Sequence, residues 1–388
     1  MATPVMDRLI RRTVASAVPL NIHFDLTYRC NERCVHCYLD HEDHGELTTC
    51  EVLEILNQLA EAGSFFLTFS GGEIFLRKDL MIILEHARRL GFDLSLKTNA
   101  LLVDAERARQ LRALGVRRIQ VSIYSADPAV HDEITKVRGS LERSLAAIRF
   151  LKSEGLMVKI ACPLMKQNLA SYEQVFRLAK ELDVPYVFDL TITPKLDGDT
   201  SPLAHRAAGS ELLPIIQSRG CADDTRPASP PRIDEDSIAS VSSSGIEGSA
   251  YDNRLCSAGH NSCYISPYGD VFPCVQLPVP SGNLRRQSFL EIWERSSGLK
   301  KIRSLRESQL RICSTCEIRR FCERCPGLAM MEGNDLMGPY ERACELAELK
   351  AQQAGLANPV SAWHRGLAGR GAREAAHSSL SSSESLAQ

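Results

Sequence analysis

Apolar runs rich in β-branched and aromatic residues alternate with amphipathic patterns of helical period from residue 20 to about residue 195. The runs predict strands at Ile22–Thr27, Phe65–Ser70, Leu94–Thr98, Ile119–Tyr124, Val158–Pro163 and Tyr186–Thr191. The windows between them predict helices near 49–62, 78–90, 104–114, 141–154 and 171–182. Thr48 or Thr49 is suited to cap the first of these helices, with Glu51 in its opening turn.

This alternation of strand and helix is typical of a parallel sheet whose strands are joined by helical crossovers. Six such strands suit an α/β fold, a partial (β/α)6 TIM-like barrel over residues 20–200. In barrels of this kind the chemistry collects at the C-terminal ends of the strands. Functional residues are therefore expected directly after each predicted strand.

The rest of the chain does not continue this pattern. Residues 1–19 read as an amphipathic helix that leads into the first strand, because the apolar stretch is too short for an export signal. Residues 201–250 read as a helix plus a flexible linker, since they include Pro-Pro and Ser-Ser-Ser-Gly. A small cysteine-dense domain is expected at 251–349, and the Ala-, Gly- and Ser-rich segment 350–388 is expected to be a disordered tail.

Composition and charge exclude some functions. The formal net charge of -2 gives no electrostatic reason to expect a nucleic-acid or anionic membrane partner. No apolar run approaches the ~20 residues that span a bilayer. A cytoplasmic location is expected, so the fourteen cysteines are reduced thiols or metal ligands rather than a disulfide framework.

Three cysteines follow the first predicted strand at the spacing Cys30-x3-Cys34-x2-Cys37. Three thiolates on one loop can ligate three irons of a [4Fe–4S] cluster, which leaves the fourth iron open for a cofactor or substrate. Zinc bound by these thiols together with His36, His41 or His44 is the alternative. We expect His36 to pack beside the cluster rather than to ligate it.

The segment from Cys30 to Tyr38 resembles the signature of the radical S-adenosylmethionine (SAM) superfamily, in the branch that carries a C-terminal SPASM domain. The resemblance covers about residues 20–349 and implies that the turn after the second strand holds the amino group of SAM. Glycines there let backbone approach a ligand, and Glu73 can accept from a cationic amine. The family usually has proline where this chain has Ile74. The SAM-binding residues that the resemblance implies are Gly71, Gly72, Glu73, Asn99, Ser122 and Arg138.

Eight further cysteines form a second array, enough for two fully ligated four-iron clusters. Gly269 reads as a hairpin turn that delivers Cys274. The resemblance groups them as Cys256, Cys263, Cys274 and Cys325 for auxiliary cluster I, and Cys313, Cys316, Cys322 and Cys344 for auxiliary cluster II. The alternative is a zinc knuckle of Cys313, Cys316, Cys322 and Cys325. Cys50, Cys162 and Cys221 are interpreted as ordinary thiols.

The Lys- and Arg-rich stretch 300–324 is interpreted as cations that offset cluster charge rather than as an RNA-binding patch.

The resemblance implies an enzyme with three [4Fe–4S] clusters that reductively cleaves SAM to a 5′-deoxyadenosyl radical and abstracts a substrate hydrogen. It acts as an oxidoreductase or maturase, with an electron donor such as flavodoxin or ferredoxin. The favoured substrate is a ribosomally made peptide or protein, with leader recognition by a separate protein or by the SPASM domain. Val275 stands where anaerobic sulfatase maturases have aspartate, so that subgroup is not expected. The alternatives are a haem-pathway porphyrin decarboxylase, with Arg or Lys facing the barrel mouth, and a non-catalytic iron–sulfur redox or sensor protein.

Overall fold

The computed structural model describes residues 4–216 and 254–366. Its contacts divide these residues into two units. The barrel unit comprises residues 4–208 and 257–304, and the C-terminal unit comprises residues 209–216, 254–256 and 305–366. Cys221, most of the predicted linker and residues 367–388 lie outside the described ranges.

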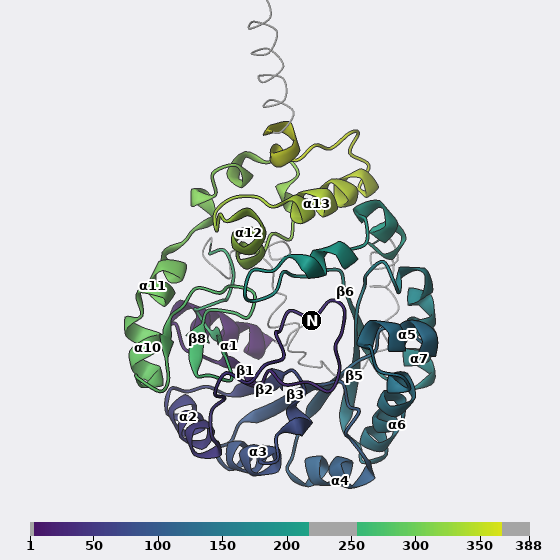
Figure 1. Cartoon of the computed structure of the whole chain (residues 1–388). Helices are drawn as coiled ribbons and strands as arrows, with labels where there is room; N and C mark the ends of the chain where they lie inside the picture. The colour runs from purple at the N-terminus through teal and green to yellow at the C-terminus, as the bar shows by residue number, and fades with distance from the viewer. Residues whose placement is uncertain (1–3, 217–253, 367–388) are drawn as a thin grey trace, which may run out of the picture. The chain divides into compact units, whose positions relative to one another are not determined.

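The barrel unit contains the predicted alternation of strands and helices, with helices on the outer face of a curved parallel sheet (Figure 1). Its parallel strands are β1 (Asn21–Thr27), β2 (Phe66–Gly71), β3 (Asp93–Thr98), β4 (Arg118–Ser122), β5 (Met157–Pro163) and β6 (Tyr186–Asp189). Its helices up to that point are α1 (Pro4–Ala15), α2 (Thr49–Glu61), α3 (Leu80–Arg89), α4 (Ala105–Ala113), α5 (Pro128–Thr135), α6 (Ser140–Ser153) and α7 (Tyr172–Glu181). The five predicted helices and six predicted strands are confirmed, and Thr48 caps α2 in a capping box with Glu51.

The two faces of the sheet differ sharply in polarity. Along β1, Ile22, Phe24 and Leu26 are at most 2 % exposed and form part of the apolar core. The alternate residues His23 and Asp25 lie on the opposite face, which we call the lumen face. Strand register continues this face across the sheet through Thr68, Ser70, Ser95, Lys97, Arg118, Gln120 and Lys159. The lumen face is therefore polar, whereas the helix-covered face is apolar.

The sheet extends beyond the six predicted strands. β7 (Ser262–Ile265) pairs parallel with β1, and β8 (Asp270–Phe272) and β9 (Gly282–Asn283) follow in antiparallel order. The strand order is β6-β5-β4-β3-β2-β1-β7-β8-β9. Residues 257–304, which the sequence placed in a separate domain at 251–349, therefore belong to the barrel unit. Gly269, at a φ of 85°, forms the predicted turn between β7 and β8.

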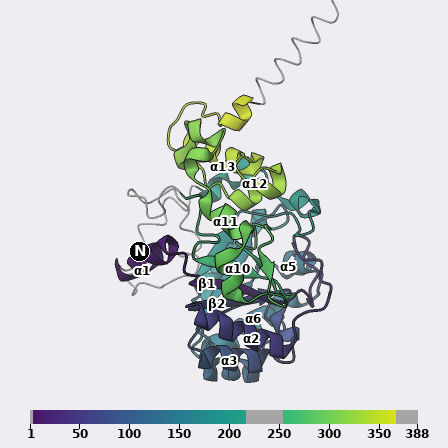
Figure 2. The same cartoon turned by 90° about the vertical axis from the view of Figure 1, so that its left-hand side faces the viewer.

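Two helices follow the hairpin, α10 (Phe289–Arg295) and α11 (Ser297–Ser304). α10 lies beside α2, as Figure 2 shows, and the backbone N–H of Phe289 donates to the side chain of Gln58. An ion pair of 2.7 Å between Arg285 and Glu51 adds a second link between the hairpin and α2. The hairpin is thus joined to the barrel unit by polar contacts as well as by strand pairing.

The C-terminal unit contains α12 (Pro326–Gly333), α13 (Glu341–Gln353) and short 3-10 turns. It continues to residue 366, so residues 350–366 differ from the disordered tail expected there. The backbone N–H of Ser361 and the ring of His364 both bond to Glu348, at 2.6 and 2.7 Å. Arg365 forms a bidentate ion pair with Glu317 at 3.0 Å. The composition of residues 350–366 did not predict this ordered structure. Leu356 is the apolar residue of the segment that packs against Ile318 and α13.

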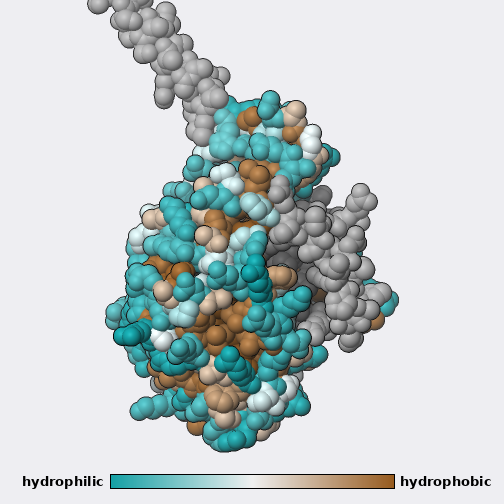
Figure 3. All heavy atoms as spheres, turned by 90° about the vertical axis from the view of Figure 1, so that its right-hand side faces the viewer, coloured by the Kyte–Doolittle hydropathy of each residue, from teal (hydrophilic) through white to brown (hydrophobic). Residues whose placement is uncertain are grey.

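Apolar side chains are also exposed on one side of the barrel unit. Figure 3 shows an apolar area on the face that lies to the right in Figure 1, where α5, α6 and α7 are found. Phe150, Met157, Phe176 and Tyr186 are between 38 and 43 % exposed. No helix in the described ranges is long and apolar enough to cross a membrane.

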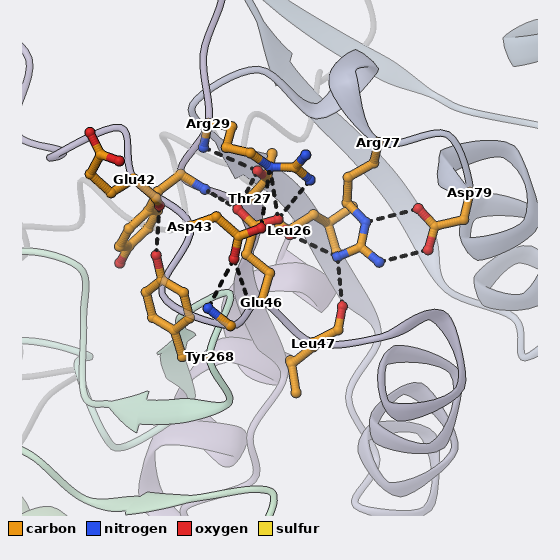
Figure 4. Close-up of polar contacts among 12 residues, drawn as sticks. Leu26, Thr27, Arg29, Glu42, Asp43, Glu46, Leu47, Arg77, Asp79 and Tyr268 are labelled. Carbon is orange, nitrogen blue, oxygen red and sulfur yellow. Dashed lines mark hydrogen bonds and ion pairs between the residues drawn. The ribbon is translucent and has the colours of Figure 1, made fainter.

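A buried arginine holds the loop after β1 in place. Arg77 donates to the carbonyl oxygens of Leu26 and Leu47 at 3.0 Å and forms two hydrogen bonds with Asp79 (Figure 4). Its side chain is 6 % exposed. A guanidinium with all these partners inside the protein fixes the end of β1 relative to the residues that precede α2.

We predict that Arg77→Met lowers the free energy of unfolding by about 3–5 kcal/mol, because it leaves a carboxylate and two carbonyls without their donor. The urea midpoint, followed by circular dichroism, measures the effect. Arg109→Met is the matched control, because Arg109 is 58 % exposed and pairs only with exposed Glu106. Equal midpoints for the two variants would contradict a structural role for Arg77.

Candidate functional site

Cys30, Cys34 and Cys37 lie on the loop that directly follows β1, and all three thiols are partly buried. The loop is held by α5, a helix that the sequence did not predict. The backbone N–H of Arg33 donates to the carbonyl of Thr135, and that of Val35 donates to Ile134, each at 3.0 Å. The C-terminal end of α5 therefore sets the path of the cysteine loop.

The environment of these thiols disfavours free thiolates. Burial raises the pKa of Cys30 to about 12, and burial also raises the pKa values of Cys34 and Cys37. Metals bind the thiolate form of cysteine. A bound metal cation would stabilise these thiolates, which burial alone destabilises. Three partly buried thiols on one loop therefore fit the ligand set of an iron–sulfur cluster with one iron left open.

Gly71 and Gly72 at the end of β2 are required by the backbone of the cysteine loop. A Cβ on Gly71 would lie 2.1 Å from the carbonyl oxygen of Thr27, and one on Gly72 would lie 2.3 Å from that of Arg29. The backbone N–H of Gly72 donates to Thr27 at 2.8 Å. In the structure these glycines permit the close contact between the ends of β1 and β2. The approach to a ligand, which the sequence interpretation gave them, stays a prediction.

Glu73 is fully buried and accepts three hydrogen bonds from its own chain. The donors are the backbone N–H of Phe75 at 3.0 Å, the hydroxyl of Thr98 at 2.8 Å and the backbone N–H of Asn99 at 2.9 Å. Burial raises the pKa of Glu73, and these hydrogen bonds oppose that change. A carboxylate offers about four acceptor positions, and the Thr98 hydroxyl lies 2.8 Å from both oxygens of Glu73, so donors of the protein itself account for these positions. A role for Glu73 toward the amino group of SAM stays a prediction.

Asn99 lies beside the cysteine loop. Its side-chain amide donates to Asn31 at 2.7 Å and lies 3.8 Å from the sulfur of Cys30. Ser122 is partly buried at the end of β4. Arg138 is exposed in the turn between α5 and α6, and in the described structure it has no hydrogen bond to these residues. The structure therefore brings Glu73 and Asn99 together with the cysteines but does not bring Arg138 to them.

Sequence reasoning missed two side chains next to the cysteines. Glu32 is 2 % exposed, accepts from the thiol of Cys34 at 3.4 Å, and has one carboxylate oxygen without a hydrogen-bond partner in the described structure. Burial raises its pKa to about 7. Tyr124 places its hydroxyl 3.6 Å from the same sulfur, and its ring packs against His36 at 5.0 Å. Glu32 could have been noticed as a carboxylate inside the cysteine motif. Nothing in the sequence around Tyr124 indicates that it contacts the cysteines.

A polar network fastens the segment after the cysteines (Figure 4). Glu46 accepts from the hydroxyl of Thr27, the backbone N–H of Tyr28 and the guanidinium of Arg29. The hydroxyl of Tyr268, in the turn between β7 and β8, donates to the carbonyl of Glu42 at 3.0 Å. The network ties both the end of β1 and the hairpin to one loop, which keeps the cysteine loop in place.

The C-terminal unit contains a partly open cavity of about 300 Å³. Among its lining residues are four cysteines, Cys313, Cys316, Cys322 and Cys344. Cys325, which the zinc-knuckle alternative requires, does not line the cavity, whereas Cys344 does. The thiols that line the cavity are those that the resemblance assigns to auxiliary cluster II, and the assignment itself stays a prediction.

Cations and an aromatic residue complete this cavity. Arg319, Arg320 and Arg324 line it, together with Trp363 from the segment after α13. Burial raises the pKa of Cys313, and nearby Arg324 opposes that change. The arrangement suits a group that carries negative charge, as a cluster with four thiolates does.

The thiols predicted for auxiliary cluster I are divided between the two units. Cys263 and Cys274 belong to the barrel unit, where burial raises the pKa of Cys263 and Cys274 adds to the effect. Cys256 and Cys325 belong to the C-terminal unit. This grouping stays a prediction. Within the described residues, no three histidine, cysteine, aspartate or glutamate side chains converge as ligands of a single metal ion would.

Comparison with known proteins places the chain in a family. Residues 24–179 match the model of the radical SAM superfamily, and residues 256–317 match an iron–sulfur cluster-binding domain, SPASM. The AdoMet-dependent heme synthase of Methanosarcina barkeri is 32 % identical over 333 residues, which cover 82 % of this chain and 94 % of that protein. The AdoMet-dependent heme synthase of Nitratidesulfovibrio vulgaris is 27 % identical over 81 % of this chain and 89 % of that protein.

Solved structures share the fold at lower identity. Streptococcus suis SuiB bound to the precursor peptide SuiA has a TM-score of 0.67 at 19 % identity, covering 87 % of this chain and 80 % of that chain. Native anSMEcpe with bound AdoMet and a Cp18Cys peptide has a TM-score of 0.62 at 16 % identity, covering 87 % of this chain and 97 % of that chain. Iron–sulfur clusters and SAM are thus the expected cofactors, and the chain belongs to the radical SAM superfamily, as an enzyme with a C-terminal SPASM domain.

Proposed function

We propose that this enzyme decarboxylates propionate side chains of an iron porphyrin, a reaction of haem formation. The sequence favoured a peptide substrate and held the porphyrin as an alternative. The alternative is better supported, because the heme synthases are similar over nearly their whole length. The peptide-bound structures are below 25 % identical, so their likeness extends only to the fold.

The observation that carries the proposal is a row of polar side chains across the lumen face. Lys97 on β3, Gln120 on β4 and Lys159 on β5 are register partners, so they share one face of three neighbouring strands. All three are partly buried. Strands two apart are separated by about 10 Å, so two ammonium groups are spread across this face. Carboxylates on a flat ligand are the natural partners of such a row.

The neighbouring row contains a cation that is already paired within the protein. Arg118 precedes Gln120 by two residues and lies on the same face. It donates to Ser95 at 3.0 Å and pairs with Asp93 at 3.1 Å. Part of its charge is therefore neutralised within the protein. Lys97, in contrast, has no ion-pair partner in the described part of the chain, which leaves its charge for a ligand.

In this proposal Cys30, Cys34 and Cys37 hold a [4Fe–4S] cluster. Gly71, Gly72, Glu73, Asn99 and Ser122 line the SAM site. Arg138 is left out, because its side chain is exposed and no hydrogen bond in the described structure joins it to these residues. When bound, the cluster and SAM supply the one-electron chemistry that removes a hydrogen atom from the substrate. The protein's part is to hold the two cofactors and the propionate close together and to shield them from water.

The proposed reaction balances without an outside oxidant. For each propionate, one hydrogen atom and one molecule of CO2 leave, a vinyl group forms, and SAM becomes methionine and 5′-deoxyadenosine. The electron spent in cleaving SAM equals the electron released when the carbon–carboxylate bond breaks. Haem contains iron and this chemistry inserts none, so the porphyrin already carries iron. A flavodoxin or ferredoxin is the proposed donor that primes the reaction.

We predict that Lys97→Met and Lys159→Met each weaken binding of a four-propionate porphyrin by about tenfold to a hundredfold, because each removes a charge-assisted hydrogen bond of ~1.5–3 kcal/mol. Absorbance titration of coproporphyrin measures affinity, and chromatography of the vinyl products measures turnover. Lys180→Met, on the exposed side of α7, is the control. If the protein binds no porphyrin and converts a precursor peptide instead, the porphyrin proposal is wrong.

We also predict that anaerobically reconstituted protein holds about twelve irons, three clusters of four, with little zinc. Replacing Cys30, Cys34 and Cys37 together with alanine should leave about eight irons and abolish release of 5′-deoxyadenosine. Metal analysis and a SAM-cleavage assay with a strong reductant test both points. Replacing Cys50, an exposed cysteine outside the arrays, is the control. Stoichiometric zinc, or cleavage that survives the triple change, contradicts the assignment.

A further inference from the structure

A buried network on the lumen face is not used by the reaction above. His23 on β1 bonds through Nε2 to Asp25 at 3.0 Å. Asp25 also accepts from the hydroxyl of Tyr264 at 2.8 Å, and that hydroxyl lies 2.6 Å from the hydroxyl of Tyr28. Because His23 and Tyr264 are register partners on neighbouring strands, the network spans the junction of β1 and β7.

The hydrogen bond to Asp25 orients the imidazole. In the tautomer that donates from Nε2 to this carboxylate, the lone pair of the ring lies on Nδ1. Asp25 is 0 % exposed, whereas the side chain of His23 is 22 % exposed. Nδ1 has no hydrogen-bond partner in the described structure and is not among its buried unpaired atoms. The lone pair is therefore accessible from the lumen.

The proposed decarboxylation gives this lone pair no proton to move. The hydrogen leaves as an atom and the carboxyl group leaves as CO2, so no base is needed. A histidine whose other nitrogen donates to a carboxylate is, however, the usual arrangement of a metal ligand, because the carboxylate orients the ring and raises its basicity. Histidine is also a common protein ligand of porphyrin iron.

We propose that His23 binds the iron of the porphyrin substrate through Nδ1, with Asp25 and Tyr264 as positioning residues. This inference rests on the proposed function. His23 lies on β1 and Lys97 on β3. Two strand spacings separate them by about 10 Å across the sheet, and because His23 is in register with Ser95, a two-residue offset adds about 7 Å along the strands. Different strands of one face would then hold the metal and the carboxylates of a single flat ligand. The step forms one nitrogen–iron bond, displaces a weak ligand such as water, and transfers no electron.

The experiment uses the full-length protein with its clusters, oxidised and kept anaerobic. Iron(III) coproporphyrin and metal-free coproporphyrin are titrated in parallel, and the Soret band and the ferric EPR signal of the bound iron form are recorded. We expect His23→Ala to lose the spectrum of nitrogen ligation and to bind the iron form at least about tenfold more weakly. Binding of the metal-free form should not change, and added imidazole should restore the spectrum.

Three variants complete the design. His44→Ala is the control, because that ring is 58 % exposed and bonds only to Asp40. Asp25→Asn should weaken binding of the iron form by about tenfold to a hundredfold and leave the metal-free form unchanged. His23→Phe keeps a ring beside Tyr264, whose centroid lies 5.5 Å away, and serves if the alanine variant does not fold.

The outcomes separate the two proposals. If the wild-type protein binds neither porphyrin, the proposed function is overturned. If it binds both, and the iron form keeps its affinity and spectrum in the His23 variants, the ligand assignment is overturned while the proposed function stands. A second measurement needs no variant: pulsed EPR of the bound ferric porphyrin should detect coupling to ¹⁵N-labelled histidine, and absence of coupling contradicts the assignment.

Discussion

The site depends on one backbone contact, at the point where the ends of β1 and β2 meet. Gly72 and Glu73 donate to the carbonyls of Thr27 and Arg29 at 2.8 and 2.9 Å, at a distance that leaves no room for a Cβ on Gly71 or Gly72. This contact fixes the start of the cysteine loop against the turn that carries Glu73. Because Glu73 in turn bonds to Thr98 and Asn99, three strand ends take their relative positions from it. Any side chain at these two glycines would therefore displace the cofactor site as a whole.

The electrostatics of the barrel unit follow from how its two faces are used. The helix-covered face is apolar, and most polar side chains of the strands are turned to the lumen. At the strand ends, buried Glu32, Glu73 and the three thiols make a site whose anionic forms are poorly solvated, as burial raises their pKa values. Such a site favours cationic occupants. Lys97 and Lys159, which precede the strand ends on the same face, carry positive charge. The lumen face therefore has one part that favours cations and another that favours anions.

Local pattern accounts for much of this fold, and its failures have physical causes. The strands β1 to β6 and most helices between them could be predicted from hydrophobic periodicity over short stretches of sequence. The first three cysteines could be recognised because their spacing lies within one loop. The parallel pairing of β7 with β1 joins residues about 240 positions apart, which no local period encodes. α5 was missed, although Asp127 caps it and Pro128 begins it. The ordered segment after α13 has the composition of a flexible tail. Its structure depends on hydrogen bonds and ion pairs with Glu348 and Glu317, which composition does not indicate.

Substrate choice in this fold has to be argued from the lumen face. The fold is shared with a structure bound to a precursor peptide, so the fold alone does not separate a peptide from a porphyrin. A peptide is recognised largely through its backbone, which calls for exposed strand edges or paired amides. The lumen face presents Lys97, Gln120 and Lys159 in one row and the oriented ring of His23 in the next. Side chains that carry charge and a lone pair, set on rigid strands, suit a stiff anionic ligand with a metal at its centre better than a flexible chain.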